Sequence, residues 1–296
     1  MAYSILTTMV KFPTVDKRNL FENNKPLYDS SKRISPAIGE LKEIGRYRHL
    51  LAQLIRRDIL TRYKRSFLGV AWTMLNPLGT MLVMTIVFAK LFRADMGEIP
   101  FSVYILSGLI VWNFFSQGTN AAMSGLVWGG NLLQRIYVPR TIFALSAIGT
   151  ATVNILLSII PLFIVMLITR AKFYLSLLFL PVPIFLLICF TLGFGLVISS
   201  LAVFFPDVSE MYQILLVAWM YLTPIIYPET IISESMMVFY KLNPMYWMVK
   251  IFRIPILNGV LPSWADMGIS AAIAFGTLII GWFFFTSKSD EYAYRV

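Results

Sequence analysis

The chain has 296 residues, of which 58% are hydrophobic and only 14% are charged, and its mean hydropathy is +0.73. These values exclude an ordinary soluble globular protein and predict an integral membrane protein with no room for a second folded domain. The formal net charge of +10 comes without a nucleic-acid recognition motif, so a membrane surface explains the bases better than DNA or RNA does.

The first 65 residues are the most basic part of the chain, with 14 of its 25 Lys and Arg residues against six Asp and Glu. Residues 1–38 show no sustained periodicity and are predicted to form a flexible cytoplasmic extension. Residues 39–65 follow a helical pattern that gathers Leu51, Leu54 and Ile55 on one face. This pattern predicts an amphipathic helix lying in the inner membrane interface, either as an anchor for the first span or in a functional role.

Six apolar stretches follow, and most of them reach the roughly 20 residues that a helix needs to cross a bilayer. We therefore predict an all-α membrane protein whose six-span domain occupies residues 66–286. The fourth stretch is too long for one straight span and should bend near Pro181 and Pro183. The fifth is short and should extend back through Val208. The six stretches are residues 67–91, 101–122, 142–169, 175–205, 212–227 and 267–285.

The distribution of bases predicts the orientation of these spans. With residues 1–65 in the cytoplasm and six crossings, 18 of the 25 Lys and Arg residues lie inside and seven lie outside. Cytoplasmic loops normally carry this excess, so both termini, including the tail at 287–296, are expected to be cytoplasmic. The connection at 123–141 then lies inside, and the segment at 228–262 lies outside.

The outer segment at 228–262 is apolar and yet contains four prolines. Each apolar piece is too short to cross the bilayer, which favours re-entrant or interfacial helices. Irregular backbone at membrane depth survives only beside protein or a water-filled cavity. The segment is therefore predicted to line the mouth of a pore.

Several kinds of chemistry are missing from the sequence. It has no G-x-x-x-x-G-K-[ST] phosphate loop, and its only histidine is His49, in the basic interface helix. No catalytic residue, metal site or cofactor of its own is predicted. The spans hold essentially no carboxylates, which argues against a symporter driven by protons or sodium. A transporter of this composition must take its energy from another protein.

The spans carry uncharged polar groups instead, and these alternate with aromatic side chains. Amides in lipid are costly, so they should face other helices or a lumen. A contact with a neighbouring helix would by itself explain the presence of any single one of these polar side chains. The mixture would also suit a sugar conduit, because flat rings stack on sugar rings and amides bond to hydroxyls. The amide and hydroxyl side chains are Asn76, Asn113, Gln117, Asn120, Asn154 and Thr223, and the aromatic ones include Trp72, Trp112, Phe114, Phe115, Trp219 and Tyr221.

Four runs of residues resemble those of ABC-2-type polysaccharide export permeases. R-D-x-x-x-R-Y-x-x-S-x-L-G-x-x-W runs from Arg57 to Trp72 and resembles the family's entrance to the first span. T-P-I-x-Y-P at 223–228 is similar to its fifth-span motif. L-N-P-M at 242–245, with Arg253 downstream, resembles its outer segment. The family's coupling loop is matched by Asn131, Leu132, Leu133, Arg135, Pro139 and Arg140.

The resemblance implies one half of an ATP-driven exporter in the bacterial inner membrane. Two copies would form a channel for a glycan carried on undecaprenyl, such as O-antigen, capsule or teichoic acid. Two separate ATPase subunits would bind ATP and Mg²⁺ and would push on the coupling loop. The residues expected to contact them are Asn131, Leu133, Arg135, Pro139 and Arg140.

The resemblance also suggests where the substrate would pass. A diphosphate headgroup would enter from the inner leaflet near His49, Arg56 and Arg57. Near the exit lie Tyr246 and Trp247. The predicted channel lining is Trp72, Asn76, Trp112, Asn113, Trp219, Tyr221, Tyr246 and Trp247.

Two departures from the family leave alternatives open. Many members carry an arginine before Asp207, where this chain has Pro206, and the segment before residue 39 is longer than usual. An ABC-2 permease for drugs or small lipids shares the topology and the ATPase partner. A membrane-bound transferase is the third alternative, but its nearest approach to a catalytic cluster is Asp207 with Glu210.

Overall fold

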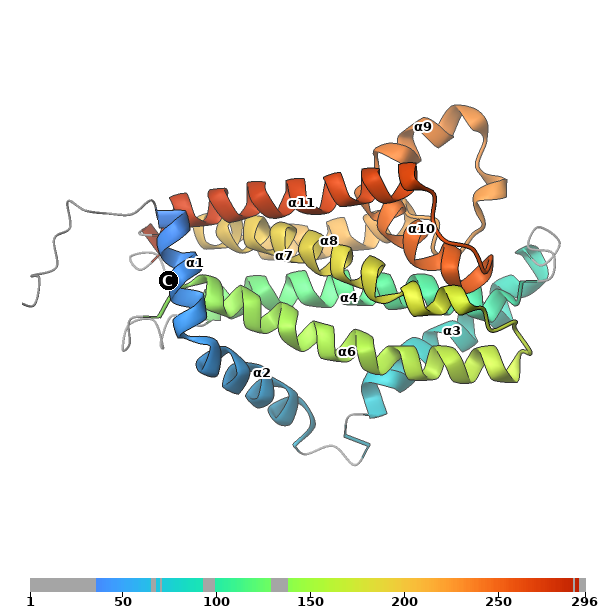
Figure 1. The fold of residues 1–296 in the computed structure, drawn as a ribbon, viewed down its shortest axis with the longest axis horizontal. Coiled ribbons are helices and arrows are strands. Elements are labelled where there is room, and N and C mark those ends of the chain that lie inside the picture. The colour runs from blue at the N-terminus through green and yellow to red at the C-terminus, as the bar shows by residue number, and fades with distance from the viewer. Residues whose placement is uncertain are drawn as a thin grey trace, which may run out of the picture. The chain divides into compact units, whose positions relative to one another are not determined.

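The computed structural model describes residues 36–64, 68–69, 71–92, 99–128, 138–289 and 291–292. This part of the chain is helical and contains no strand (Figure 1). Its elements are α1 (Pro36–Arg46), α2 (Arg48–Tyr63), α3 (Ala71–Phe92), α4 (Phe101–Trp128), α6 (Thr141–Ile168), η3 (Leu175–Phe179), α7 (Pro181–Phe204), α8 (Val208–Tyr221), η4 (Glu229–Ile231), α9 (Glu234–Leu242), α10 (Pro244–Leu257) and α11 (Trp264–Ser287), where η marks a 3₁₀ turn.

Four helical segments are long and apolar enough to cross a membrane, namely α3, α6, α7 with its preceding turn, and α11. Helix α4 has 28 residues, or about 42 Å at 1.5 Å per residue, but side chains such as Asn113 and Gln117 lower its hydropathy. Helix α8 has 14 residues, about 21 Å, which is shorter than the hydrocarbon core. The all-helical class is therefore confirmed with four candidate spans, and six spans remain a prediction.

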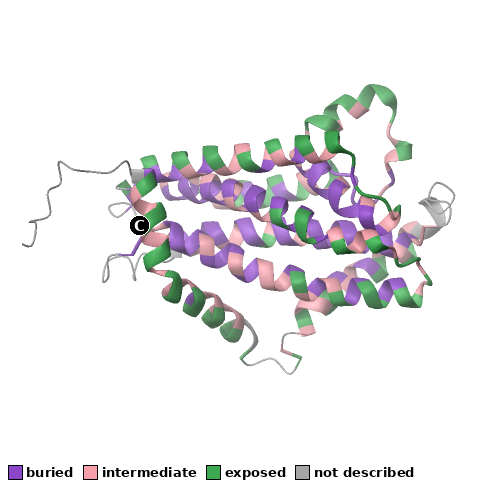
Figure 2. Ribbon diagram, viewed as in Figure 1, coloured by how far each residue is buried: buried purple, intermediate pink, exposed green. Residues whose placement is uncertain are grey.

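Helix α4 holds the centre of the helical packing. It contacts α3, α6, α7 and α10, and side chains such as Ile105, Val111 and Phe115 are completely buried. Figure 2 shows this helix as mostly buried, whereas α2 and α9 present many exposed residues. A helix that is apolar nearly all round belongs inside a bundle.

Helices α7 and α11 run side by side and approach closely at two glycines (Figure 1). A Cβ atom on Gly193 would lie 2.5 Å from the backbone nitrogen of Leu278, and one on Gly281 would overlap the carbonyl of Gly193. Small residues let helix backbones come together in a membrane, where packing rather than water drives association.

The backbone is irregular at two places, of which only the first was predicted from prolines. The fourth stretch is divided at Leu180, where the η3 turn ends and α7 begins with Pro181. In the fifth stretch, the helix starts at Val208 as expected but ends at Tyr221, so the T-P-I-x-Y-P run at 223–228 is not helical. Pro224 cannot donate a backbone hydrogen bond, which favours this end to the helix.

The predicted interface helix at 39–65 is found as two helices, α1 and α2, which meet at Tyr47. The apolar face of α2 is partly covered by protein. Leu54 packs against Val138 and Ile142, and Ile55 occupies the space beside Gly149 on α6. Contacts with α6, and not membrane lipid alone, therefore satisfy part of this face.

Candidate functional site

A polar pocket of about 380 Å³ lies between α3, α4 and α6. Four amide side chains line it, one from α3, two from α4 and one from α6. No charged residue is among the lining residues that the structure describes. The lining residues are Trp72, Thr73, Asn76, Pro77, Ile110, Asn113, Phe114, Gln117, Ala151, Asn154, Ile155 and Ser158.

Helical spacing brings the amides together. Asn113 and Gln117 are four residues apart on α4 and therefore share one face, and Asn154 and Ser158 have the same spacing on α6. The hydroxyl of Ser158 donates to the backbone carbonyl of Asn154 at 2.8 Å, so its hydrogen is held within the helix. The amides are then the main groups able to bond to a ligand. Such a pocket has no acid or base to transfer a proton, but it can bind hydroxyl-rich neutral molecules.

Three of the predicted channel-lining residues, Trp72, Asn76 and Asn113, meet in this pocket. Trp112 and Trp219 lie elsewhere, with rings 5.8 Å and 5.2 Å from the ring of Phe115 in a buried aromatic cluster. Aromatic pairs at these distances stabilise helix packing. In this single chain these two tryptophans therefore contribute to the core.

The other predicted lining residues belong to α8 and α10. Tyr221 is exposed at the end of α8. Tyr246 and Trp247 are buried on α10, where the Tyr246 hydroxyl donates to Glu229 at 3.1 Å and the Trp247 indole donates to the carbonyl of Lys241 at 2.8 Å. The structure does not bring these three residues to the polar pocket, and their role in a channel stays a prediction.

Asn243 holds the start of α10 in place. Its side-chain oxygen accepts hydrogen bonds from the Met245 backbone at 3.0 Å and from the Trp219 indole at 2.7 Å. Its amide nitrogen donates to the hydroxyl of Thr223 at 2.9 Å. Asn before Pro244 is a favoured helix start, since Asn caps the first turn and proline fits its first position.

Arg253 is a buried cation among backbone carbonyls. Its guanidinium donates to the carbonyls of Tyr104 at 3.1 Å and Ile225 at 2.8 Å, and also to that of Pro224. The same group lies 3.8 Å from the centre of the Tyr104 ring. These bonds tie the non-helical run at 223–228 to α4 and α10. The sequence marked Arg253 only as part of a motif and gave no sign of this role.

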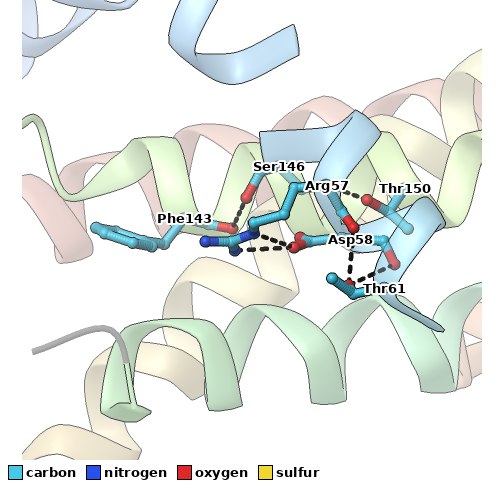
Figure 3. A network of polar contacts seen from close by, with 6 residues as sticks. All are labelled: Arg57, Asp58, Thr61, Phe143, Ser146 and Thr150. Atoms are coloured by element: carbon cyan, nitrogen blue, oxygen red, sulfur yellow. Dashed lines mark hydrogen bonds and ion pairs between the residues drawn. The ribbon is translucent and has the colours of Figure 1, made fainter. Parts of the chain in front are cut away.

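The residues predicted at the headgroup entrance all lie on α2. His49, Arg56 and Arg57 are exposed. Figure 3 shows Arg57 turned along its own helix toward Asp58, to which it is joined at 2.8 Å, beside the hydroxyls of Ser146 and Thr150 on α6. An exposed ion pair of this kind is weak, so Arg57 can exchange Asp58 for another anion at little cost.

Two of the predicted ATPase contacts, Pro139 and Arg140, are described at the start of α6, whereas Asn131, Leu133 and Arg135 lie outside the described residues. The Arg140 guanidinium lies 5.9 Å from the centre of the Tyr292 ring, and the Tyr292 hydroxyl donates to Ser200 at 2.6 Å. The segment predicted to contact the ATPase therefore ends close to Tyr292, which is bonded to α7.

Gln117, Asn154 and Ser158 line the pocket but were not among the predicted site residues. The four-residue spacing of Asn113 with Gln117 was the available signal, since it places both on one face. The sequence could not show which faces of α3, α4 and α6 meet.

Four helical segments long and apolar enough to cross a membrane indicate a multi-pass membrane protein. Residues 49–257 match the ABC-2 type transporter family, and the chain belongs to that family. It is therefore a permease chain of an ABC transporter.

Among curated proteins, the chain is 29% identical over 258 residues to the O-antigen export system permease protein RfbA of Myxococcus xanthus, covering 86% of this chain and 97% of that protein. It is 24% identical to RfbA of Klebsiella pneumoniae, with coverage of 72% and 82%. It is also 24% identical to the polysialic acid transport protein KpsM of Escherichia coli, with coverage of 80% and 92%.

Proposed function

We propose that this chain is the channel subunit of an ATP-driven exporter that carries lipid-linked polysaccharide of the O-antigen type across the bacterial inner membrane. The polar pocket between α3, α4 and α6 is the observation that carries the proposal. The similarity to permeases named for O-antigen and polysialic acid agrees with it.

The chemistry of the pocket suits a polymer rich in hydroxyls. Asn76, Asn113, Gln117 and Asn154 offer donors and acceptors without a fixed charge, and Trp72 offers a flat apolar surface. Uncharged groups bind successive sugars without trapping any of them, as conduction requires. The diphosphate of an undecaprenyl carrier would instead meet the exposed bases His49, Arg56 and Arg57 at the inner interface.

The proposed transporter contains two copies of this chain, each of which spans the membrane six times. Wide apolar faces are available for the second copy. On α3, Ile86 is 71% exposed, and on α8, Ile214 is 73% exposed. The outer helices α9 and α10 would enter the membrane from outside without crossing it, because both are too short to span.

Energy would come from two ATPase subunits, which hold the ATP and Mg²⁺. They would push on the coupling segment at 123–141, which leads through Pro139 and Arg140 directly into α6. Helix α6 carries Asn154 into the pocket, so a shift of this helix would change the shape of the pocket. A rigid helix transmits such a displacement over its whole length.

Substitution of the pocket amides tests the proposal. Asn113→Leu with Asn154→Leu keeps the size of both side chains but removes their hydrogen bonds, each worth about 1 kcal/mol. We expect surface polysaccharide to fall by about tenfold or more while protein amount and melting temperature are unchanged. Asn258→Leu, at the exposed end of α10, is the matched control and should export normally. Full export by the double variant would contradict a role for the pocket.

A further inference from the structure

A second cavity of about 750 Å³ lies on the other side of α6, between this helix, the η3 turn and α7. Its lining is almost entirely hydrocarbon, with side chains such as Leu156, Phe163, Leu178 and Phe185. Three of these, Leu156, Leu178 and Phe185, are more than half exposed. Cavities of this size hold small ligands, and this one is suited to an acyl chain.

The η3 turn is held away from α6 by its contacts with the α10 side, which keeps the cavity open. The hydroxyl of Ser176 donates to the carbonyl of Pro255 at 2.7 Å. The ring of Tyr174 fills the space beside Gly259, where a Cβ atom would overlap it. Gly259 has φ +70°, a conformation that favours glycine, so this contact is specified by the residue type. The groove is therefore built into the fold and does not depend on a loose loop.

Two bases lie close in sequence to the lining of this groove, in the short connection between α6 and η3. Arg170 and Lys172 are both exposed and immediately precede the lining residues Phe173 and Tyr174. Positive charge near a long apolar groove complements a molecule with an anionic headgroup and an acyl chain.

Arg170 also occupies an unusual backbone conformation. The α6 helix ends in a Schellman motif, in which the backbone nitrogen of Ala171 donates to Met166 at 2.8 Å and that of Arg170 to Leu167 at 3.3 Å. The left-handed position of this motif normally belongs to glycine, yet here it is Arg170, with φ 55°. A residue that retains unfavourable backbone geometry at such a position is expected to contribute something that glycine cannot, and here that is a positive charge.

We infer that this groove binds one anionic glycerophospholipid, with an acyl chain along α6 and α7 and the phosphate at Arg170 and Lys172. This site is separate from the polar pocket and does not depend on the identity of the exported molecule. In the predicted orientation of the chain it faces the outer leaflet.

The test uses the purified full-length protein in neutral detergent, titrated with phosphatidylglycerol or phosphatidylcholine while the melting temperature is followed. For the wild type we expect a larger rise with phosphatidylglycerol. Arg170→Gly with Lys172→Gln should reduce that response to the level of phosphatidylcholine, at about fivefold in affinity for each base. Without lipid, the glycine should leave the melting temperature unchanged or higher, which separates lost binding from damaged folding.

Two further variants complete the design. Lys241→Gln removes an exposed base on α9, away from the groove, and should keep the full preference for phosphatidylglycerol. Leu178→Trp fills the groove and should weaken the response to both lipids. An equal response of the wild type to the two lipids would overturn the inference, as would a full preference in the double variant. Dissociation of a dimer by Leu178→Trp, with lipid responses unchanged, would overturn it in favour of a protein interface.

Discussion

Arg253 places a buried positive charge among backbone carbonyls, with Glu229 as the carboxylate that acts on it electrostatically. Its bonds to the carbonyls of Pro224 and Ile225 replace hydrogen bonds that helix geometry would otherwise supply at the T-P-I-x-Y-P run, and its bond to the carbonyl of Tyr104 ties that run to α4. Gly108 on α4 makes this possible, because a Cβ atom there would overlap the guanidinium. One arginine and one glycine thus determine the local path of the backbone.

Gly108→Ala is expected to destabilise the protein. The added methyl group would displace the guanidinium and leave buried carbonyls without donors, at a cost of about 1–3 kcal/mol for each lost partner. Thermal unfolding of the purified protein measures the effect. Gly79→Ala on α3 is the control, because nothing lies within 4 Å of its Cβ position and alanine favours helix. Equal melting temperatures for the two variants would show that Arg253 has room to move.

Glu40 on α1 is a second residue whose environment has a testable effect, here on how the stability of the protein depends on pH. Burial raises the pKa of its carboxyl above the ordinary value of 4.5, although Thr141 and Arg140 act in the opposite direction. The folded protein therefore holds this proton more tightly than the unfolded chain does. The resulting stabilisation is complete below pH 4.5 and is lost as the pH rises through the raised pKa.

Glu40→Gln should remove that loss. The melting temperature of the variant should rise relative to that of the wild type as the pH is raised from about 5 to about 8. Glu234→Gln, at an exposed position on α9, is the control, and its melting temperature should differ from that of the wild type by a constant amount over the same pH range. A constant difference between Glu40→Gln and the wild type at all pH values would contradict the assignment.

At the scale of whole elements, α7 and α11 approach each other closely at Gly193. Gly193→Ala would push a methyl group into the backbone of Leu278, and backbone cannot move aside as a side-chain end can. We expect a loss of stability of about 1–3 kcal/mol, the usual cost of overpacking. Gly276→Ala on α11 has open space around its Cβ position and should be neutral or mildly stabilising. The opposite order of melting temperatures would mean that the two helices are not packed this closely.

Much of the element pattern was predictable because long apolar runs have few alternatives. The starts of α4 and α8, the break before Pro181 and the helical nature of the outer segment all follow from run length and proline position. The division of the interface helix at Tyr47 was not predicted, although Gly45 lies two residues before it. The meeting of Asn76, Asn113 and Asn154 depends on which faces of three helices pack together, and no local signal encodes that.

At the scale of the whole molecule, the proposed substrate route would pass three parts of the chain. The bases His49, Arg56 and Arg57 are exposed along α2, the uncharged pocket lies among α3, α4 and α6, and α10 is held by Asn243 and Arg253. The chain belongs to a family of ABC transporter permeases, whose energy comes from ATP. The proposed route therefore separates charge recognition at the inner interface from neutral sugar binding inside the membrane.

The most direct measurement deletes the gene and extracts lipid-linked glycan separately from the cell surface and from the inner membrane. The account predicts that polymer disappears from the surface and accumulates inside on its lipid carrier, and that the wild-type gene restores export. Normal surface polysaccharide without internal accumulation would contradict glycan export and would favour an ABC-2 permease for drugs or small lipids.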